Sequence, residues 1–271
     1  MADHRQIQIA TPSLGEEEWQ GLREPIETGW LTQGPKVAAF EKAFALRHQV
    51  KHAIAVTSAT TGLHLALAAL ELGPGDEVIV PAFTWVATAN VVIYCGATPV
   101  LVDVDRVTFN MDPQHLARRV TSRTKAVIPV HLFGLCADID AIRKVLRPDI
   151  RIIEDAACAA GAAWHGRSAG GLGDLGVFSF HPRKSITTGE GGMVTTNDDK
   201  LAERVKMLRN HGASVSEEER HRGPRPYLLP EFDLLGFNYR MTDLQGAVGL
   251  VQLKKLDQFI DERAHMAAQY R

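Results

Sequence analysis

From residue 50 onward, short runs rich in Val and Ile alternate with helical patterns, with single helices between most of the runs. Such runs are typical of strands that are buried on both faces of a parallel sheet, and such a sheet needs crossover helices. The pattern predicts an α/β fold of three layers, with a mostly parallel central sheet and helices on both faces. Ligands of such sheets bind at the carboxyl ends of the strands, so the chemistry should lie there.

The predicted elements follow from hydrophobic periodicity and from turn and cap residues. The predicted strands cover residues 52–58, 77–83, 98–105, 125–134, 150–155, 176–182 and 191–197. The predicted helices cover residues 61–76, 84–96, 112–122, 138–148 and 198–212. A final amphipathic pattern runs from Asp243 to Tyr270, with an apolar stripe at near-helical spacing.

Charge and cysteine usage narrow the class of protein. The 30 Lys and Arg against 32 Asp and Glu give a formal net charge of -2, which provides no general field for nucleic acid or an anionic membrane. The start of the chain has no apolar region of the kind found in secretory signals. Cys95, Cys136 and Cys158 form no CxxC pair, which favours the cytoplasm over a disulfide scaffold or a zinc site.

Two histidines, His48 and His52, stand four residues apart in "HQVKH". The glutamate of the zinc motif HExxH is missing, so the pair is better interpreted as a polar helix face than as metal ligands. We therefore expect no metal site.

The strand predicted at residues 52–58 is followed by hydroxyl side chains that could help to bind a ligand. Ser58, Thr60 and Thr61 stand at the start of the following helix, where free N–H groups and the helix dipole favour an anion. On these residues alone, an ordinary Ser/Thr helix cap is the better explanation. GxxxxGK[ST], the usual signature of nucleoside-triphosphate binding, is not found in the sequence.

The strand predicted at residues 150–155 drives an apolar run into Glu154 and Asp155. A carboxylate at the tip of a central strand is costly unless it meets a cation or a hydrogen-bond donor. The small residues that follow leave room for a flat ligand, although Asp155 as a helix cap is the open alternative.

A lysine completes the set. Lys184 follows the strand that carries Ser179 and precedes a glycine-rich turn, in "FSFHPRKSITTGEGG". An amine, an anion cradle and a carboxylate at one sheet edge suit pyridoxal phosphate (PLP): lysine for the Schiff base, Asp155 for the pyridinium nitrogen, and a helix N-terminus for the phosphate. Trp85, at the end of another strand, offers a face for stacking on the ring.

Longer motifs point to a known family. These motifs are "GWLTQGP", "GDEVIVPAFTWVATANVVIYCGATPVLVDVD", "PVHLFG", "IEDAACAAGA", "FSFHPRKSITTGEGGMVTTND", "LRNHG" and "GFNYRMTDLQGAVGLVQL". They resemble the DegT/DnrJ/EryC1/StrS family of PLP-dependent sugar aminotransferases, in register from about Ile9 to the last residue. The resemblance implies an aspartate-aminotransferase fold and transfer of an amino group from glutamate to a keto group of a nucleotide-linked deoxysugar.

The resemblance also implies roles for single residues. Lys184 would be the Schiff-base lysine and Asp155 the partner of the pyridinium, while Trp85 would stack on the ring. The residues that would hold the phosphate are Ala59, Thr60, Ser179 and, from the neighbouring subunit, Asn238. The resemblance therefore implies a homodimer with shared active sites.

The chain departs from the family pattern in three places. Ala59 replaces the middle glycine of Ser-Gly-Thr, which is a mild change unless the backbone there is left-handed. Cys158 stands above the ring where a longer Gln or His is common. Family members also continue into a small C-terminal domain, whereas this chain stops in the helix that would lead to it.

This resemblance suggests a division of the chain. We expect an N-terminal arm and helix at residues 1–40, a large PLP-binding domain at 41–245, and a connecting helix toward a missing small domain at 246–271. The alternative function is a PLP-binding fragment or regulatory protein with weak or no activity. A sugar dehydratase fits less well, because Lys184 occupies the position that a histidine takes in those enzymes and His181 lies three residues earlier.

Overall fold

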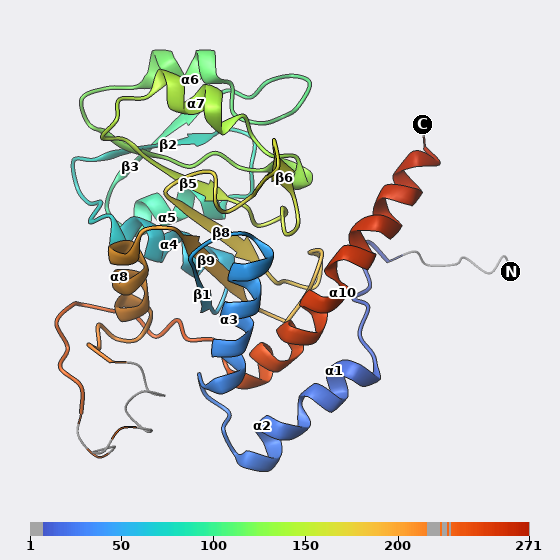
Figure 1. The fold of residues 1–271 in the computed structure, drawn as a ribbon. Helices are drawn as coiled ribbons and strands as arrows, with labels where there is room; N and C mark the ends of the chain where they lie inside the picture. The colour runs from blue at the N-terminus through green and yellow to red at the C-terminus, as the bar shows by residue number, and fades with distance from the viewer. Residues whose placement is uncertain (1–7, 216–222, 224–226, 228, 271) are drawn as a thin grey trace, which may run out of the picture.

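The structure, a computed structural model, describes residues 8–215, 223, 227 and 229–270. A seven-stranded sheet with strand order β1-β9-β8-β5-β4-β2-β3 forms its centre (Figure 1). The strands are β1 (His52–Val56), β2 (Glu77–Pro81), β3 (Thr98–Val102), β4 (Thr124–Val127), β5 (Arg151–Asp155), β8 (Leu175–Ser179) and β9 (Gly192–Thr196). A separate small hairpin consists of β6 (Ala163–Trp164) and β7 (Arg167–Ser168).

The sheet is parallel from β8 through β5, β4 and β2 to β3. Only β9 runs the other way, because it pairs antiparallel with both β1 and β8. The carboxyl ends of β1, β2, β4, β5 and β8 therefore meet at one edge, and β9 begins at that edge. The predicted α/β fold with a mostly parallel sheet is confirmed.

Helices cover both faces of the sheet (Figure 1). The helices are α1 (Glu16–Gly21), α2 (Arg23–Thr28), α3 (Pro35–Arg47), α4 (Ala59–Ala69), α5 (Ala87–Tyr94), α6 (Pro113–Arg119), α7 (Ile139–Val145), α8 (Asp199–Arg209) and α10 (Asp243–Ala268), with a short 3-10 turn at Leu132–Gly134. One apolar core joins α3, α6, α7 and α10 to the sheet, and a second joins α4, α5 and α8 to the opposite face.

Strand periodicity explains how one strand serves both cores. In β5, Ile152 lies in the α3 core and Ile153 in the α4 core, since successive side chains of a strand point to opposite faces. The same alternation sends Glu154 and Asp155 to opposite faces of the sheet. The position of each carboxylate is therefore set by the hydrophobic pattern that precedes it.

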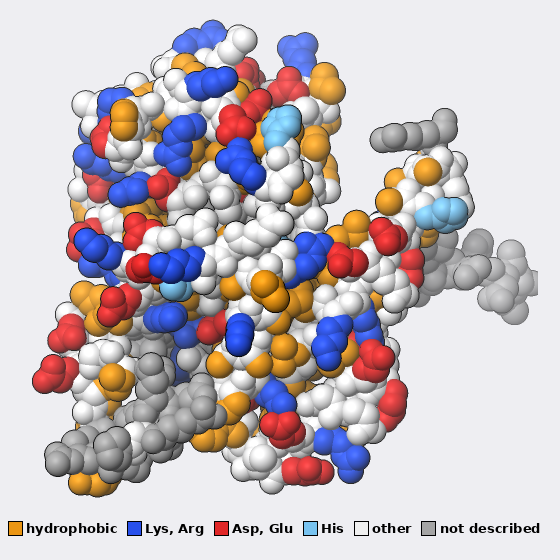
Figure 2. All heavy atoms as spheres, viewed as in Figure 1, with side chains coloured by type: hydrophobic (Ala, Val, Ile, Leu, Met, Phe, Trp, Pro, Cys, Tyr) orange, Lys and Arg blue, Asp and Glu red, His pale blue; other side chains and the backbone are white. Residues whose placement is uncertain are grey.

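The long helix α10 is fixed to α3 at its start. The buried carboxylate of Asp243 accepts hydrogen bonds from the backbone N–H groups of Gly34, Lys36 and Val37, at 2.9, 3.0 and 2.9 Å. Figure 2 shows hydrophobic side chains gathered on this face around the crossing of α3 and α10, with acidic and basic side chains scattered over the rest. From residue 261 to residue 270 the helix is exposed and projects from the body (Figure 1).

Some predicted boundaries are wrong by a few residues. The helix predicted at residues 84–96 is α5, which begins only at Ala87, and the strand predicted at 125–134 ends at Val127 before a 3-10 turn. The predicted polar face of His48 and His52 is also wrong. His48 is fully buried, while His52 opens β1 and contacts Asp199 through its ring at 2.6 Å.

The described residues show neither a membrane-spanning helix nor a metal cluster. No helix there combines the length and apolar character needed to cross a bilayer. No group of three or more His, Cys, Asp and Glu side chains there has the arrangement of a metal site.

The buried ring of His48 connects α3 to the segment that follows β5. It stacks on Phe44 at 4.0 Å between ring centroids, its Nδ1 donates to the Phe44 carbonyl at 3.2 Å, and Gly161 N–H donates to its Nε2 at 3.2 Å. Burial lowers the pKa of His48 to about 4. Between about pH 6.5 and pH 4 the unfolded chain binds this proton more readily than the folded chain. The free energy of unfolding therefore falls as the pH decreases through this range, and His48 makes it no lower above about pH 6.5.

We predict that the His48→Gln variant loses less stability on acidification than the wild type. The lowering of the His48 pKa corresponds to about 3 kcal/mol in the free energy of unfolding, at roughly 1.4 kcal/mol per pKa unit. Urea unfolding at several pH values between 7 and 4 measures it, with His265→Gln on the exposed end of α10 as the control. Parallel pH dependence of the wild type and the His48→Gln variant would contradict the prediction.

Candidate active site

The segment that carries Lys184 is a closed loop at the carboxyl edge of the sheet. Residues 180–191 connect the end of β8 to the start of β9, where Ser179 pairs with Gly192. Phe180 N–H donates to the Gly191 carbonyl at 2.9 Å, and Lys184 N–H donates to the His181 carbonyl at 2.8 Å. Lys184 is therefore held by its backbone between two neighbouring strands.

The amino group of Lys184 reaches toward the end of β5. Its Nζ donates to Cys158 Sγ at 3.1 Å, and Cys158 follows Asp155 by three residues. The charge of Lys184 is also close enough to act on the Asp155 carboxyl group. The structure thus brings together three residues that were selected from the sequence.

Asp155 is a buried carboxylate with few donors. Its Oδ2 accepts a hydrogen bond from Thr88 Oγ1 at 2.8 Å, and its Oδ1 accepts one from Ala157 N–H at 3.2 Å. Burial raises the pKa of Asp155, against the opposing effects of these two hydrogen bonds and of the Lys184 charge. No ion pair joins Asp155 to a cationic side chain in the part of the chain that the structure describes. A cationic N–H group placed beside it would stabilise its charge.

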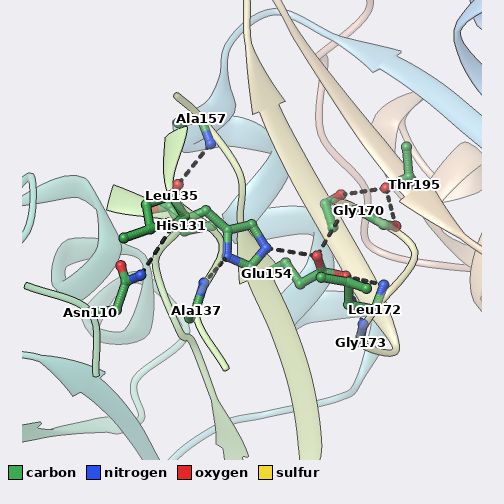
Figure 3. A network of polar contacts seen from close by, with 12 residues as sticks. Asn110, His131, Leu135, Ala137, Glu154, Ala157, Gly170, Leu172, Gly173 and Thr195 are labelled. Carbon is green, nitrogen blue, oxygen red and sulfur yellow. Dashed lines mark hydrogen bonds and ion pairs between the residues drawn. The ribbon is translucent and has the colours of Figure 1, made fainter. Parts of the chain in front are cut away.

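The neighbouring carboxylate, Glu154, has a different role on the other face of the sheet (Figure 3). It accepts hydrogen bonds from the backbone N–H groups of Gly170, Leu172 and Gly173, at 2.7, 2.7 and 2.6 Å, and contacts His131 Nε2 at 2.8 Å. Ala137 N–H donates to His131 Nδ1 at 3.0 Å, so the ring proton lies on Nε2 and faces Glu154. Glu154 is therefore occupied structurally and is not available to a ligand.

The start of α4 forms a cradle for an anion. Ser58 Oγ accepts from Thr61 N–H at 3.1 Å, whereas the N–H groups of Ala59 and Thr60 have no acceptor among the described residues. Gly192 lies directly beneath them: a Cβ there would come within 2.7 Å of Ala59 N. Two free N–H groups at the start of an 11-residue helix are suited to a phosphate.

Ser179 completes this region from the neighbouring strand, since it pairs with Gly192 across β8 and β9. Ala59 begins α4 and is not among the residues with positive φ, so alanine in place of glycine strains nothing there. The structure therefore places Ala59, Thr60 and Ser179 around one cradle.

The last two predicted site residues face outward. Trp85 is 77% exposed and lies one turn before Thr88, whose N–H donates to the Trp85 carbonyl at 3.1 Å. Asn238 is exposed and lies beside Asn210, and no hydrogen bond within the described chain joins it to Lys184 or Asp155. Its predicted role toward a neighbouring subunit stays a prediction.

The donor set fits PLP. Lys184 provides the amine, Asp155 is a buried carboxylate without a cationic hydrogen-bond partner among the described residues, and the free N–H groups of Ala59 and Thr60 lie next to Gly192, the strand partner of Ser179. These are the three groups that a phosphorylated pyridinium aldehyde needs.

Sequence reasoning missed Thr88 and His131. Thr88 is a fully buried hydroxyl on the otherwise apolar inner face of α5, and a polar residue at such a position is a signal that could have been used. The role of His131 carried no such signal, because its partners come from the distant segments around Glu154 and Ala137.

Comparison with known proteins gives concordant results. Residues 12–271 match the DegT/DnrJ/EryC1/StrS aminotransferase family. GDP-perosamine synthase of Caulobacter vibrioides is 48% identical over 272 residues, which cover 100% of this chain and 70% of that protein.

Solved structures resemble the whole fold. The putative sugar aminotransferase Spr1654 from Streptococcus pneumoniae, in its PMP-form, superposes with a TM-score of 0.91 at 31% identity, over 98% of this chain and 71% of that one. Its PLP-form gives a TM-score of 0.89 at 31% identity, over 97% and 70%. The aminotransferase TlmJ from Streptoalloteichus hindustanus gives 0.90 at 36% identity, over 98% and 70%.

The cradle generates a prediction about Gly192. In the Gly192→Ala variant the new Cβ would lie 2.6 Å from the Ser58 carbonyl carbon, so the start of α4 must move away from β9. We expect PLP affinity to fall by about tenfold or more, since a loss of about 1.4 kcal/mol of phosphate binding is enough for that change. We also expect the thermal midpoint of unfolding to fall.

Equilibrium dialysis and thermal unfolding provide the two measurements. Gly73→Ala is the matched control, because the nearest atom to its new Cβ would be 3.9 Å away. Wild-type PLP affinity in the Gly192→Ala variant would show that the phosphate does not bind at this cradle.

Proposed function

The chain belongs to the DegT/DnrJ/EryC1/StrS aminotransferase family, and from that premise we propose that it moves an amino group from glutamate to a keto group of a nucleotide-linked deoxysugar. The observation that carries the proposal is the meeting of Lys184, Asp155 and the α4 cradle at one edge of the sheet. These groups supply an amine, a carboxylate and an anion site at the same edge of the sheet.

PLP is the cofactor, as in the solved PLP- and PMP-forms of the related aminotransferase. When bound, it supplies an aldehyde that exchanges amines and a ring that accepts electrons from the substrate carbon. Every other contribution comes from residues of the protein.

Lys184 holds the cofactor through its amino group. The same amine, once free of the cofactor, would move a proton between the donor's α-carbon and C4′ of the cofactor. Its contact with Cys158 Sγ, at 3.1 Å, gives the released amine a defined place beside the site.

Asp155 accepts a hydrogen bond from the ring nitrogen of the cofactor and keeps that nitrogen protonated. A charge-assisted hydrogen bond of this kind is worth about 1.5–3 kcal/mol. Ala59, Thr60 and Ser179 bind the phosphate, and the exposed indole of Trp85 stacks on the ring. Cys158 would contact the cofactor, since its Sγ accepts a hydrogen bond from the Lys184 amine.

The substrate class follows from the relative at 48% identity, whose name gives a GDP-linked amino sugar as its product. We propose a nucleotide-linked keto sugar as the acceptor here, with a GDP-linked sugar as the first candidate. We propose the cytoplasm as the location, because Cys95, Cys136 and Cys158 are all free thiols, as is usual in reducing compartments.

The central experiment follows the cofactor spectrum. Glutamate should convert the PLP spectrum to that of the amino form, and a GDP-linked keto deoxysugar should restore it, because the two half-reactions alternate. Borohydride reduction before glutamate is added should fix a pyridoxyl group on Lys184, as peptide mapping can determine. The Lys184→Arg variant should show neither result, whereas Lys254→Arg should behave as the wild type.

A pyridoxyl label on another lysine would remove Lys184 from its assigned role. A spectrum that glutamate leaves unchanged would contradict the choice of amino donor. If only sugars that lack a nucleotide restored the PLP spectrum, the proposed acceptor class would be wrong.

We also propose a homodimer with shared active sites. Asn238 is exposed and follows Phe237, which lines one surface hollow together with Leu235, 92% exposed, and Tyr94, 59% exposed. Exposed apolar surface of this kind is typical of an interface between subunits. Asn238 would then bind the cofactor phosphate of the partner.

Mixing two defective variants tests this sharing. The Asn238→Ala variant should bind PLP about tenfold more weakly, the loss of roughly one hydrogen bond to a charged group, and the Lys184→Arg variant should not be labelled. Heterodimers of the two contain one complete site, so labelling of Lys184 at low PLP concentration should return on mixing. A mixture that is labelled no better than the Asn238→Ala variant alone would exclude sharing.

A further inference from the structure

Two threonine hydroxyls lie behind Asp155, and the function proposed above does not use them. Thr88 Oγ1 donates to Asp155 Oδ2 at 2.8 Å, and Thr84 Oγ1 lies 3.0 Å from Thr88 Oγ1. Thr88 is fully buried on α5, while Thr84 is half-buried in the turn before the helix. The three side chains form a continuous polar chain from the rim of the site to its most buried carboxylate.

The direction of the donors in this chain is determined by Asp155. An ionised carboxylate can only accept hydrogen bonds, so the Thr88 hydroxyl proton must point toward Asp155. The oxygen of Thr88 is then free to accept, and the Thr84 hydroxyl donates to it. A protonated Asp155 could instead donate to Thr88, and both hydroxyls would rotate the other way. Because a hydrogen bond donated to the charged form of an acid favours that form, the Thr88 hydroxyl favours the ionised Asp155.

The surroundings leave Asp155 dependent on this chain. Thr88 is the one side chain that donates a hydrogen bond to Asp155 in the described part of the protein, and Ala157 contributes a backbone N–H at 3.2 Å. The other polar groups that act on it are Lys184, from the loop between β8 and β9, and His131, from the segment that follows β4. Glu154 points to the opposite face of the sheet. Once Lys184 holds the cofactor, Thr88 would still donate to Asp155, whereas the charge of the free Lys184 amine would no longer act on it.

The two threonines also lie next to Trp85, the proposed stacking residue. Trp85 stands between the two threonines in sequence, and its carbonyl accepts from Thr88 N–H at 3.1 Å. One turn of chain therefore positions both the proposed ring-stacking face and the donor that orients Asp155. A hydroxyl hydrogen bond to a buried charge is stronger than one to a neutral group, and donors that are linked in a chain strengthen each other.

We propose that Thr84 and Thr88 form a hydroxyl relay that holds the Asp155 carboxylate ionised and aimed at the ring nitrogen of the cofactor. Both threonines are positioning residues, because they act through Asp155 and touch no reacting atom. This inference rests on the proposed function, since it needs Asp155 to serve PLP. It adds two residues to the site that set how strongly the cofactor's ring nitrogen stays protonated.

A double-mutant cycle tests the relay. The Thr88→Val variant keeps the shape of the side chain and removes the donor, so PLP affinity should fall about tenfold and kcat with it, while KM for glutamate stays within about twofold. Thr84→Val should lower PLP affinity by about threefold in the wild-type background. It should have no further effect in the Thr88→Val background, because its only route to Asp155 has been removed.

The conservative variants keep the test independent of folding. Thr88→Ser and Thr84→Ser retain the hydroxyl groups and should stay within about twofold of the wild type in PLP affinity and turnover. If Thr88→Val fails to fold, Thr84→Val against Thr84→Ser still compares a chain without and with the outer hydroxyl. Equal effects of the Val and Ser variants would overturn the relay.

Two outcomes separate this inference from the proposed function. If Lys184 of the wild type takes up the pyridoxyl label, but the effects of Thr84→Val and Thr88→Val simply add, the relay is wrong and the function stands. If Lys184 of the wild type takes up no label, the proposed function fails, and the relay fails with it.

Discussion

The organisation of the active edge depends on one buried carboxylate, that of Glu154. It accepts hydrogen bonds from the backbone N–H groups of Gly170, Leu172 and Gly173. It also contacts the His131 ring, and both of these side chains are fully buried. His131 in turn donates its backbone N–H to the Asp155 carbonyl at 3.0 Å, and Thr195 on β9 donates to the Gly170 carbonyl at 2.7 Å. Since a buried charge without partners costs several kcal/mol, β4, β5 and β9 must keep the positions that satisfy Glu154. Asp155 therefore lies on the opposite face, where Thr88 and the Ala157 N–H are the hydrogen-bond donors to its carboxylate among the described residues.

Much of the fold could be predicted because its signals are local. The Val and Ile runs and the single helices between them are properties of short stretches, and they predicted the parallel sheet with helices on both faces. The reversed direction of β9 was not predicted, since a buried strand has the same apolar pattern in either direction. The start of α5 was misplaced because residues 84–86 have side chains that a helix accepts and no Gly or Pro marks the boundary, although the backbone there is a bend and a turn.

The site shows the same division between local and distant information. Lys184, Asp155 and the start of α4 were identified because each ends or follows a strand, and the common edge of a parallel sheet brings such ends together. The buried environment of His48 could not be predicted, because it depends on Phe44 in its own helix and on Gly161, which is 113 residues away. Distant pairings of this kind have no periodic pattern, so a lone polar residue gives no hint of whether it is exposed or satisfied inside the core.

The antiparallel direction of β9 has a consequence for the motion of the lysine. Since β8 ends and β9 begins at the same edge, the intervening loop leaves and re-enters the sheet at adjacent points, Ser179 and Gly192. Inside the loop, Thr188 N–H donates to the Phe180 carbonyl at 3.0 Å and Thr187 N–H donates to Gln252 Oε1 at 3.2 Å, so its backbone is tied to the sheet and to α10. Rotation about the side-chain bonds is then the main motion that carries the Lys184 amine from place to place. The reach of that amine is thus a fixed radius around one anchored Cα. Any substrate must be brought within this radius by the surrounding protein, because the loop cannot travel to meet it.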